Sequence, residues 1–222
     1  MELKIVKADI ERNPFIGMFL QTNETHSFLP PTTPSHLVSL VQDALGTQAV
    51  KLFISQSPLI GIFSVVNSNG VVLSKQAEAR EISVFKKLGL NVCFMDKLAP
   101  GNTVLCNDYG CVVPKLVERK QAQEIQDCLG VPVLRVEFDS IQAIGSGCVA
   151  NNYGLLAYNE LEDGEIKLIC DQLKVSSSAR ATNNLGTPYN KYGLVANSNG
   201  AVVGSLTTGF ELQRIYSTLS KE

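Results

Sequence analysis

The stretch PGNTVLCNDYGCVVP at residues 100–114 decides the fold. It contains an apolar run, a tight turn from Asn107 to Gly110, a second apolar run and a final proline. Asparagine at the first position of a turn can hydrogen-bond the turn backbone, and glycine at the fourth can adopt a positive φ without a Cβ clash. Two short apolar runs around such a turn predict a β-hairpin, with a bulge at Gly110.

The same pattern occurs five times along the chain. Four copies carry a glycine three residues after the turn asparagine, and the first copy carries His26, a residue that tolerates left-handed backbone conformations better than most. The turn asparagines, 40 to 46 residues apart, are Asn23, Asn67, Asn107, Asn151 and Asn197. A period of this size indicates a repeat architecture, here with five units.

Length and composition favour one domain over residues 1–222. Each unit is too short to bury a core alone, and the chain is 45% hydrophobic and 18% charged. No stretch has the length of a membrane span, and the N-terminus lacks the apolar region of a secretory signal. Six cysteines without paired spacing indicate a reducing, cytoplasmic compartment. The net charge of −2 disfavours binding that depends mainly on the phosphates of DNA or RNA.

Each unit is expected to run hairpin, helix, strand. The expected helices are residues 35–45, 78–88 and 116–129, with two more near 160–173 and 208–219; the expected outer strands are 50–54, 90–95 and 131–136. The units are approximately 9–55, 56–96, 97–137, 138–180 and 181–222, the last joined by 1–8. The fifth unit lacks a final strand, while residues 3–8 form a strand without a partner. Because open sheet edges are avoided, the N-terminal strand is expected to close the ring, with helices outside and hairpins inside.

Two stretches carry a family resemblance. Both resemble the translation initiation factor 6 family. The first comprises residues 100–102 and 106–109. The second is 184–212, which contains ANSNGAVVG at 196–204 and TTGFEL at 207–212. The resemblance covers essentially the whole chain and implies an α/β fold, the pentein, which is a five-bladed α/β propeller. It is closest to the archaeal branch, because the sequence stops at Glu222 without the phosphorylatable tail of eukaryotic members.

The resemblance also implies a function. Members bind the large ribosomal subunit, prevent its premature association with the small subunit and act in large-subunit biogenesis, without catalysis or a cofactor. The implied partner is mainly a ribosomal protein near the sarcin–ricin loop, with some rRNA contact, and the implied state is a monomer that binds neither membrane nor DNA.

The loops that precede the five hairpins are expected to cluster at one end of the ring, because they come from equivalent points of equivalent units. The resemblance implies a binding role for Asn102 and Tyr189. We extend this role to the other loops as a hypothesis. The expected ribosome-binding face consists of Gly17, Met18, Gly61, Ile62, Gly101, Asn102, Gly145, Ser146, Tyr189, Asn190 and Lys191. Six residues before the turn asparagine the other units carry Ile-Gly, or Pro-Gly in the third, whereas the fifth unit carries Asn190-Lys191, which leaves the shape of its loop open. The glycines also have a structural explanation, as residues that permit the sharp approach to each hairpin.

The alternative function is a pentein enzyme that modifies guanidino groups of arginine-like substrates. Such an enzyme needs a cysteine nucleophile activated by histidine. His26 and His36 both lie in the first unit, while Cys106 and Cys111 occupy positions that are mostly small or apolar in other units and are expected in the core. No Cys/His pair has metal-ligand spacing. A third possibility is a protein-interaction scaffold without a ribosomal role.

Overall fold

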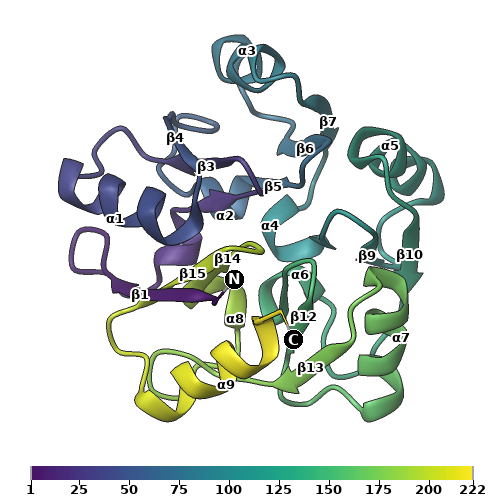
Figure 1. The fold of residues 1–222 in the computed structure, drawn as a ribbon. Coiled ribbons are helices and arrows are strands. Elements are labelled where there is room, and N and C mark those ends of the chain that lie inside the picture. The colour runs from purple at the N-terminus through teal and green to yellow at the C-terminus, as the bar shows by residue number, and fades with distance from the viewer. Residues whose placement is uncertain (1, 222) are drawn as a thin grey trace.

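In the computed structural model, which describes residues 2–221, five small sheets surround a central channel and long helices lie outside them (Figure 1). In the first blade, β2 (Gln21–Thr22) pairs antiparallel with β3 (His26–Leu29), and β3 pairs in parallel with β4 (Gln48–Lys51). The helix α1 (Ser35–Leu45) connects β3 to β4. This is the five-bladed α/β propeller, or pentein, that the sequence predicts.

The next three blades repeat this plan. The second comprises β5 (Ser64–Val66), β6 (Gly70–Ser74), α3 (Ala79–Lys87) and β7 (Asn91–Met95). The third comprises β8 (Leu105–Cys106), β9 (Cys111–Pro114), α5 (Arg119–Leu129) and β10 (Val133–Val136). The fourth comprises β11 (Val149–Ala150), β12 (Gly154–Ala157), α7 (Asp163–Leu173) and β13 (Ser177–Arg180).

The fifth blade joins the two ends of the chain. It takes β14 (Leu194–Ala196), β15 (Gly200–Gly204) and α9 (Gly209–Leu219) from the C-terminal region. Its outer strand is β1 (Lys4–Ala8), which pairs in parallel with β15 from Lys4–Gly200 to Ala8–Gly204. The predicted closure of the ring by the N-terminal strand is confirmed.

The helix boundaries largely follow the sequence signals. The helix α1 has the expected bounds and ends at Gly46, whose φ of 64° makes it a left-handed cap; Gly130 ends α5 in the same way. The helix α5 begins three residues later than expected, because Val117 N–H closes a turn on the Pro114 carbonyl before the extended cap Glu118. The strand expected at 50–54 is β4, shifted toward the N-terminus to face His26.

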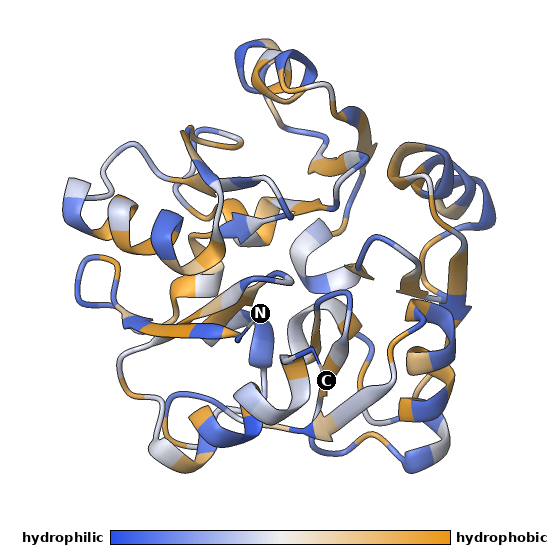
Figure 2. Ribbon diagram, viewed as in Figure 1, coloured by the Kyte–Doolittle hydropathy of each residue, from blue (hydrophilic) through white to orange (hydrophobic). Residues whose placement is uncertain are grey.

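The core lies in the seams between blades. Each long helix except α3 packs extensively on a sheet of the preceding blade: α1 on β15, α5 on β6, α7 on β9 and α9 on β12. Figure 2 shows the corresponding apolar residues along the strands and hydrophilic residues outside on the long helices. The helix α3 projects outward in Figure 1, and the Phe28 and Phe85 rings, 4.9 Å apart, fill its seam. Within residues 2–221 no helix combines the length and apolar character needed to cross a membrane.

The hairpin turns form as predicted, but the stated reason for their glycines is wrong. Gly110 has no positive φ, and the pairs Leu105–Val112 and Cys106–Cys111 continue without a bulge in this hairpin. A Cβ on Gly110 would instead overlap the carbonyl oxygen of Gln172, near the end of α7 in the next blade. The equivalent glycines that meet the next helix in the same way are Gly70, Gly154 and Gly200. Close approach between blades therefore requires glycine.

The first turn has His26 in place of the glycine and supports the same explanation. His26 has no positive φ either; it is the first residue of β3. Its neighbour is the outward-projecting α3, so the backbone contact that demands glycine elsewhere is relaxed here. The expectation that His26 was tolerated for its left-handed conformation is therefore wrong.

The five turn asparagines form a closed ring of hydrogen bonds. Within each turn the Oδ1 atom accepts backbone N–H groups; that of Asn107 accepts from Tyr109 at 2.9 Å and Gly110 at 3.0 Å. Each Nδ2 donates to the backbone carbonyl of the next turn asparagine at 3.0–3.3 Å, in the order Asn23, Asn67, Asn107, Asn151, Asn197 and back to Asn23. Four of the amides also donate to the carbonyl of a helix-terminal leucine, namely Leu45, Leu129, Leu173 or Leu219.

The first prediction tests this ring. The substitution Asn151→Asp keeps the shape and the acceptors but places a carboxylate oxygen against the carbonyls of Asn197 and Leu219, where the amide donated twice. Because unsatisfied buried groups cost about 1–3 kcal/mol each, and more when charged, we expect the free energy of unfolding to fall by about 3 kcal/mol or more at neutral pH. Urea unfolding measures the change. The exposed Asn159→Asp is the control, and equal unfolding midpoints for the two variants would contradict the prediction.

Candidate functional site

The channel has two chemically different ends. Each inner strand runs toward its asparagine turn, and the central and outer strands run away from it. One end, the asparagine face, therefore holds the five turns. The other, the rim-helix face, holds the starts of the long helices and five single-turn rim helices. These are η1 (Ile16–Met18), α2 (Ile60–Phe63), α4 (Pro100–Thr103), α6 (Ile144–Gly147) and α8 (Asn190–Gly193).

Glycines allow the rim helices to pack around the channel. A Cβ on Gly101 would overlap the carbonyl oxygen of Gly61, and one on Gly61 would overlap that of Gly17. A Cβ on Gly145 would lie 2.8 Å from the carbonyl oxygen of Gly101. Each rim helix accordingly contacts its two neighbours. The structural explanation for these glycines is thus close packing between units.

The structure brings all eleven residues of the expected ribosome-binding face to this end, but only part of that set forms surface. Six of them are buried: Gly17, Gly61, Gly101, Gly145, Ser146 and Asn190. Met18, Ile62 and Asn102 are half-buried, and Tyr189 is exposed. The buried glycines therefore form little of the surface at this end, because they pack against neighbouring rim helices.

Exposed apolar side chains gather around this end, and sequence reasoning identified Tyr189 but missed the others. We call Leu116, Leu185, Tyr189, Leu206 and Phe210 the apolar rim. Leu185 and Phe210 are the most exposed, at 69% and 70%. All five lie at the rim-helix face, and four of them belong to the fifth unit.

Comparison of the units reveals this difference. Phe210 is the second residue of its helix, and the equivalent residues are His36, Arg80, Lys120 and Gly164. Leu185 adopts a φ of 62° in the loop before its rim helix. The residues with the same backbone conformation in the equivalent loops of the first and second units are polar, namely Arg12 and Gln56. The signal that could have found the apolar rim was the loss of polar residues at these positions, mainly in the fifth unit and also at Leu116 of the third.

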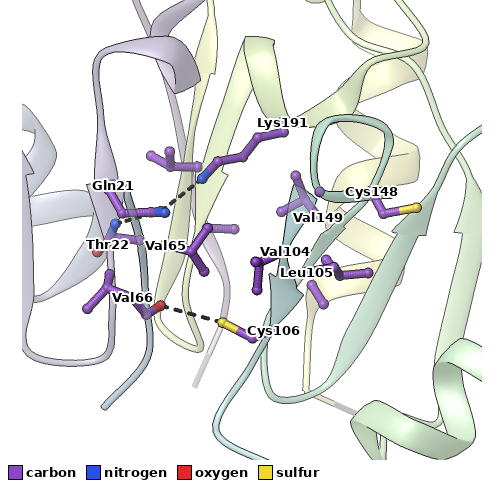
Figure 3. A pocket seen from close by; sticks show the side chains of 14 residues that line it. Gln21, Thr22, Val65, Val66, Val104, Leu105, Cys106, Cys148, Val149 and Lys191 are labelled. Atoms are coloured by element: carbon purple, nitrogen blue, oxygen red, sulfur yellow. Dashed lines mark hydrogen bonds between the residues drawn. The ribbon is translucent and has the colours of Figure 1, made fainter. Parts of the chain in front are cut away.

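The channel itself narrows to a cavity of about 50 Å³ between the inner strands (Figure 3). Lys191 of α8 directs its ammonium into this cavity, where Nζ donates to Gln21 Oε1 at 2.8 Å. Burial lowers the pKa of Lys191 to about 8. Lys191 therefore lines the channel. Its charge lies inside the ring and not on the expected ribosome-binding face.

Cys106 also lines the channel, and Cys111 is fully buried in the core. Desolvation raises the pKa of Cys106 to about 12, so its thiol is protonated at neutral pH and is a poor nucleophile. His26 Nδ1 lies 2.8 Å from Thr25 Oγ1, His36 is exposed at the start of α1, and neither lines the cavity. Among residues 2–221 no group of three or more His, Cys, Asp or Glu side chains could hold a metal ion.

Comparison with known proteins identifies the family. The model of the eIF-6 family matches residues 5–218. This chain belongs to the eIF-6 family. The translation initiation factor 6 of Pyrobaculum arsenaticum is 36% identical over 97% of this chain and 98% of its own length. Those of Pyrobaculum aerophilum and Picrophilus torridus are 35% and 33% identical, over 92% and 97% of this chain and 93% and 100% of their own lengths. A solved agmatine deiminase of C. jejuni covers 55% of this chain and 49% of its own, with a TM-score of 0.38 and 12% identity, a likeness too slight to bear on function.

In this eIF-6 family member the asparagine face carries paired carboxylates. Glu24 Oε1 accepts Ser198 Oγ at 2.9 Å, and the Asn152 amide donates to both Glu24, at 3.3 Å, and Asp108, at 2.9 Å. Burial raises the pKa of Glu24, the hydrogen bonds from Ser198 oppose this, and the Asp108 charge adds to it. The carboxyl of Glu24 therefore binds a proton more readily in the folded protein than in the unfolded chain.

The second prediction follows from that pKa. Between the pKa of Glu24 in the unfolded chain and its higher pKa in the fold, the folded state holds more protons, so the free energy of unfolding rises as the pH falls through this interval. We expect the stability of the natural protein to rise in that interval relative to that of Glu24→Gln. Denaturant titrations at a series of pH values measure the difference. The exposed Glu160→Gln is the control, and a pH-independent difference for Glu24→Gln would refute the prediction.

Proposed function

We propose that this chain is a translation initiation factor that binds the large ribosomal subunit and prevents its premature association with the small subunit. A role in large-subunit biogenesis accompanies this activity. Membership of the eIF-6 family over residues 5–218 supports the proposal, as do the translation-factor names of relatives that match nearly their whole length.

The rim-helix face is the proposed contact surface, and one observation carries this assignment. Large exposed apolar side chains gather at that end, in the apolar rim, whereas among residues 2–221 Tyr109 is the one large exposed apolar residue of the asparagine turns. Apolar side chains bind a partner by excluding water from closely packed surfaces, and aromatic residues contribute most to such contacts. Asn102 and Tyr189, which the family resemblance marks, lie on the same face.

The chemistry of this face favours a protein as the principal partner. Apolar groups gain little from nucleic-acid phosphates, and the chain carries 19 basic against 21 acidic residues. The proposed partner is therefore mainly a ribosomal protein near the sarcin–ricin loop, with limited rRNA contact. The factor acts as a monomer in the cytoplasm, and its blocking action is steric, because the bound ring occupies surface that the small subunit needs.

The alternative, an enzyme acting on guanidino groups, has less support. Its nucleophile would be Cys106, whose pKa of about 12 keeps the thiol protonated, and neither His26 nor His36 faces it across the cavity. The cationic Lys191 ammonium inside the channel would also repel a guanidinium substrate.

The third prediction tests the function itself. Adding the purified protein to separated ribosomal subunits should reduce the amount of joined ribosome in a sucrose gradient. The protein should sediment with the large subunit only, since steric blocking needs a single binding partner. Sedimentation with the small subunit, or undiminished joining at saturating protein, would refute the proposed function.

The fourth prediction tests the face. The substitution Phe210→Glu removes an exposed ring but should preserve stability, because glutamate is favourable in the first turn of a helix and can pair with Arg214 four residues later. If the apolar rim contacts the partner, large-subunit affinity should fall about tenfold or more, which corresponds to about 1.4 kcal/mol.

The matched control is Tyr109→Glu, which places the same charge on the exposed aromatic residue of the asparagine face. Binding titrations and melting temperatures should be measured for both variants. Equal affinities for the two variants would contradict the assignment of the contact to the rim-helix face, and loss only in the control would place the contact at the asparagine face. Gly101 is unsuitable for this test, since any side chain there would overlap the backbone of Gly61.

A further inference from the structure

One residue breaks the fivefold pattern inside the channel. The second residue of each rim helix is glycine in four blades, namely Gly17, Gly61, Gly101 and Gly145, and it is Lys191 in the fifth. The four glycines carry no side chain to occupy the channel mouth. Lys191 alone extends from the ring of rim helices, and its amine lies between the inner strands (Figure 3).

The ammonium is held in a fixed position. Its one hydrogen bond to a side chain is to Gln21 Oε1, which also accepts the N–H of Thr22 at 3.2 Å. The Nε2 of Gln21 donates to the Ser64 carbonyl at 3.0 Å, so the carboxamide cannot rotate without losing that bond. An ammonium has three donor hydrogens, and Gln21 satisfies one of them.

Lys191 has no acidic partner. Among the described residues, none of the four salt bridges includes it. The other ionisable residues of the cavity wall are Cys106 and Cys148, whose thiols are both neutral at pH 7 because burial raises their pKa values to about 12. Glu24 and Asp108 line the adjoining hollow at the asparagine face, which shares Thr22 and Cys106 with the cavity wall; neither carboxylate lines the cavity that holds the ammonium.

The other residues that line the cavity are mostly apolar in type. Five valines, four from the inner strands and one directly before β8, are among them: Val65, Val66, Val104, Val149 and Val195. At about 50 Å³ the cavity has room for roughly three or four water-sized particles. A positive charge facing such a wall is costly unless it is paired, and a small counter-ion fits the space.

We propose that the channel binds a small monovalent anion, of the size of a halide, on the ammonium of Lys191. The cavity volume excludes large organic anions, and the single charge favours a monovalent ion. The site belongs to the fifth blade alone, because only there does the rim helix supply a cation.

The probe is chloride, compared with gluconate, which is too large for the cavity. The melting temperature of the full-length protein is measured at pH 7 in sodium chloride and in sodium gluconate of equal ionic strength. An anion that binds only the folded state raises the melting temperature by mass action. We expect chloride to raise it by about 2–4 °C for the natural protein and for the exposed-surface control Lys87→Met, and to leave Lys191→Met unchanged.

An equal chloride effect in all three proteins, or none in the natural one, would overturn the proposal and indicate that only water fills the cavity. If Lys191→Met does not fold, Lys191→Gly restores the residue of the other four blades and takes its place. Two results on the natural protein provide further tests. The chloride effect should disappear between pH 7 and pH 9.5, as Lys191 loses its proton, and crystals soaked in bromide should show an anomalous peak beside Lys191 Nζ. Persistence of the effect at pH 9.5, or absence of that peak, would equally reject the site.

Discussion

The donation of each turn asparagine to the next is the interaction on which the structure depends. The acceptor oxygen of a turn asparagine holds its own hairpin, and its amide holds the neighbouring blade. One buried side chain thereby joins local and long-range order, and in four of the five turns all its hydrogen-bonding capacity is used. Because the five donations form a closed circle, no blade can move outward without breaking bonds on both of its sides. The spacing of the blades, and hence the narrow channel, follows from this geometry.

Close spacing explains the glycines at both ends of the channel. At the asparagine face Gly110 lets the end of α7 reach Asn107, whose amide donates to the Leu173 carbonyl at 2.8 Å. At the rim-helix face Gly61 and Gly101 let successive rim helices touch. Where α3 stands away from the ring, the turn carries His26, and Asn23 makes no bond to a helix carbonyl. The seam between the first two blades is accordingly held by the Phe28–Phe85 contact more than by backbone packing.

The repeat pattern was enough to predict five units, the long helices and the closing strand, because each depends on local periodicity or on counting elements. The sequence did not predict the purpose of Gly110 or the burial of Gly101, since both arise from contacts with another unit that local turn chemistry does not describe. The strand β13, with the polar sequence SSAR, has no apolar run and exists because it pairs with β12. The inward direction of Lys191 was hidden for the same reason, although its departure from the Ile-Gly pattern marked the position as unusual.

A ring of five similar units can present a specific surface only where the units differ. Most differences among the blades are conservative within the core, because the blades share the same interblade contacts. The departures that change surface or channel chemistry are concentrated in the fifth unit: apolar Leu185, Leu206 and Phe210 on the outside and cationic Lys191 within. This unit is also the one assembled from both ends of the chain, through β1 and β15. Its contact surface is therefore complete only when the ring has closed, which couples the proposed binding face to the folding of the whole chain.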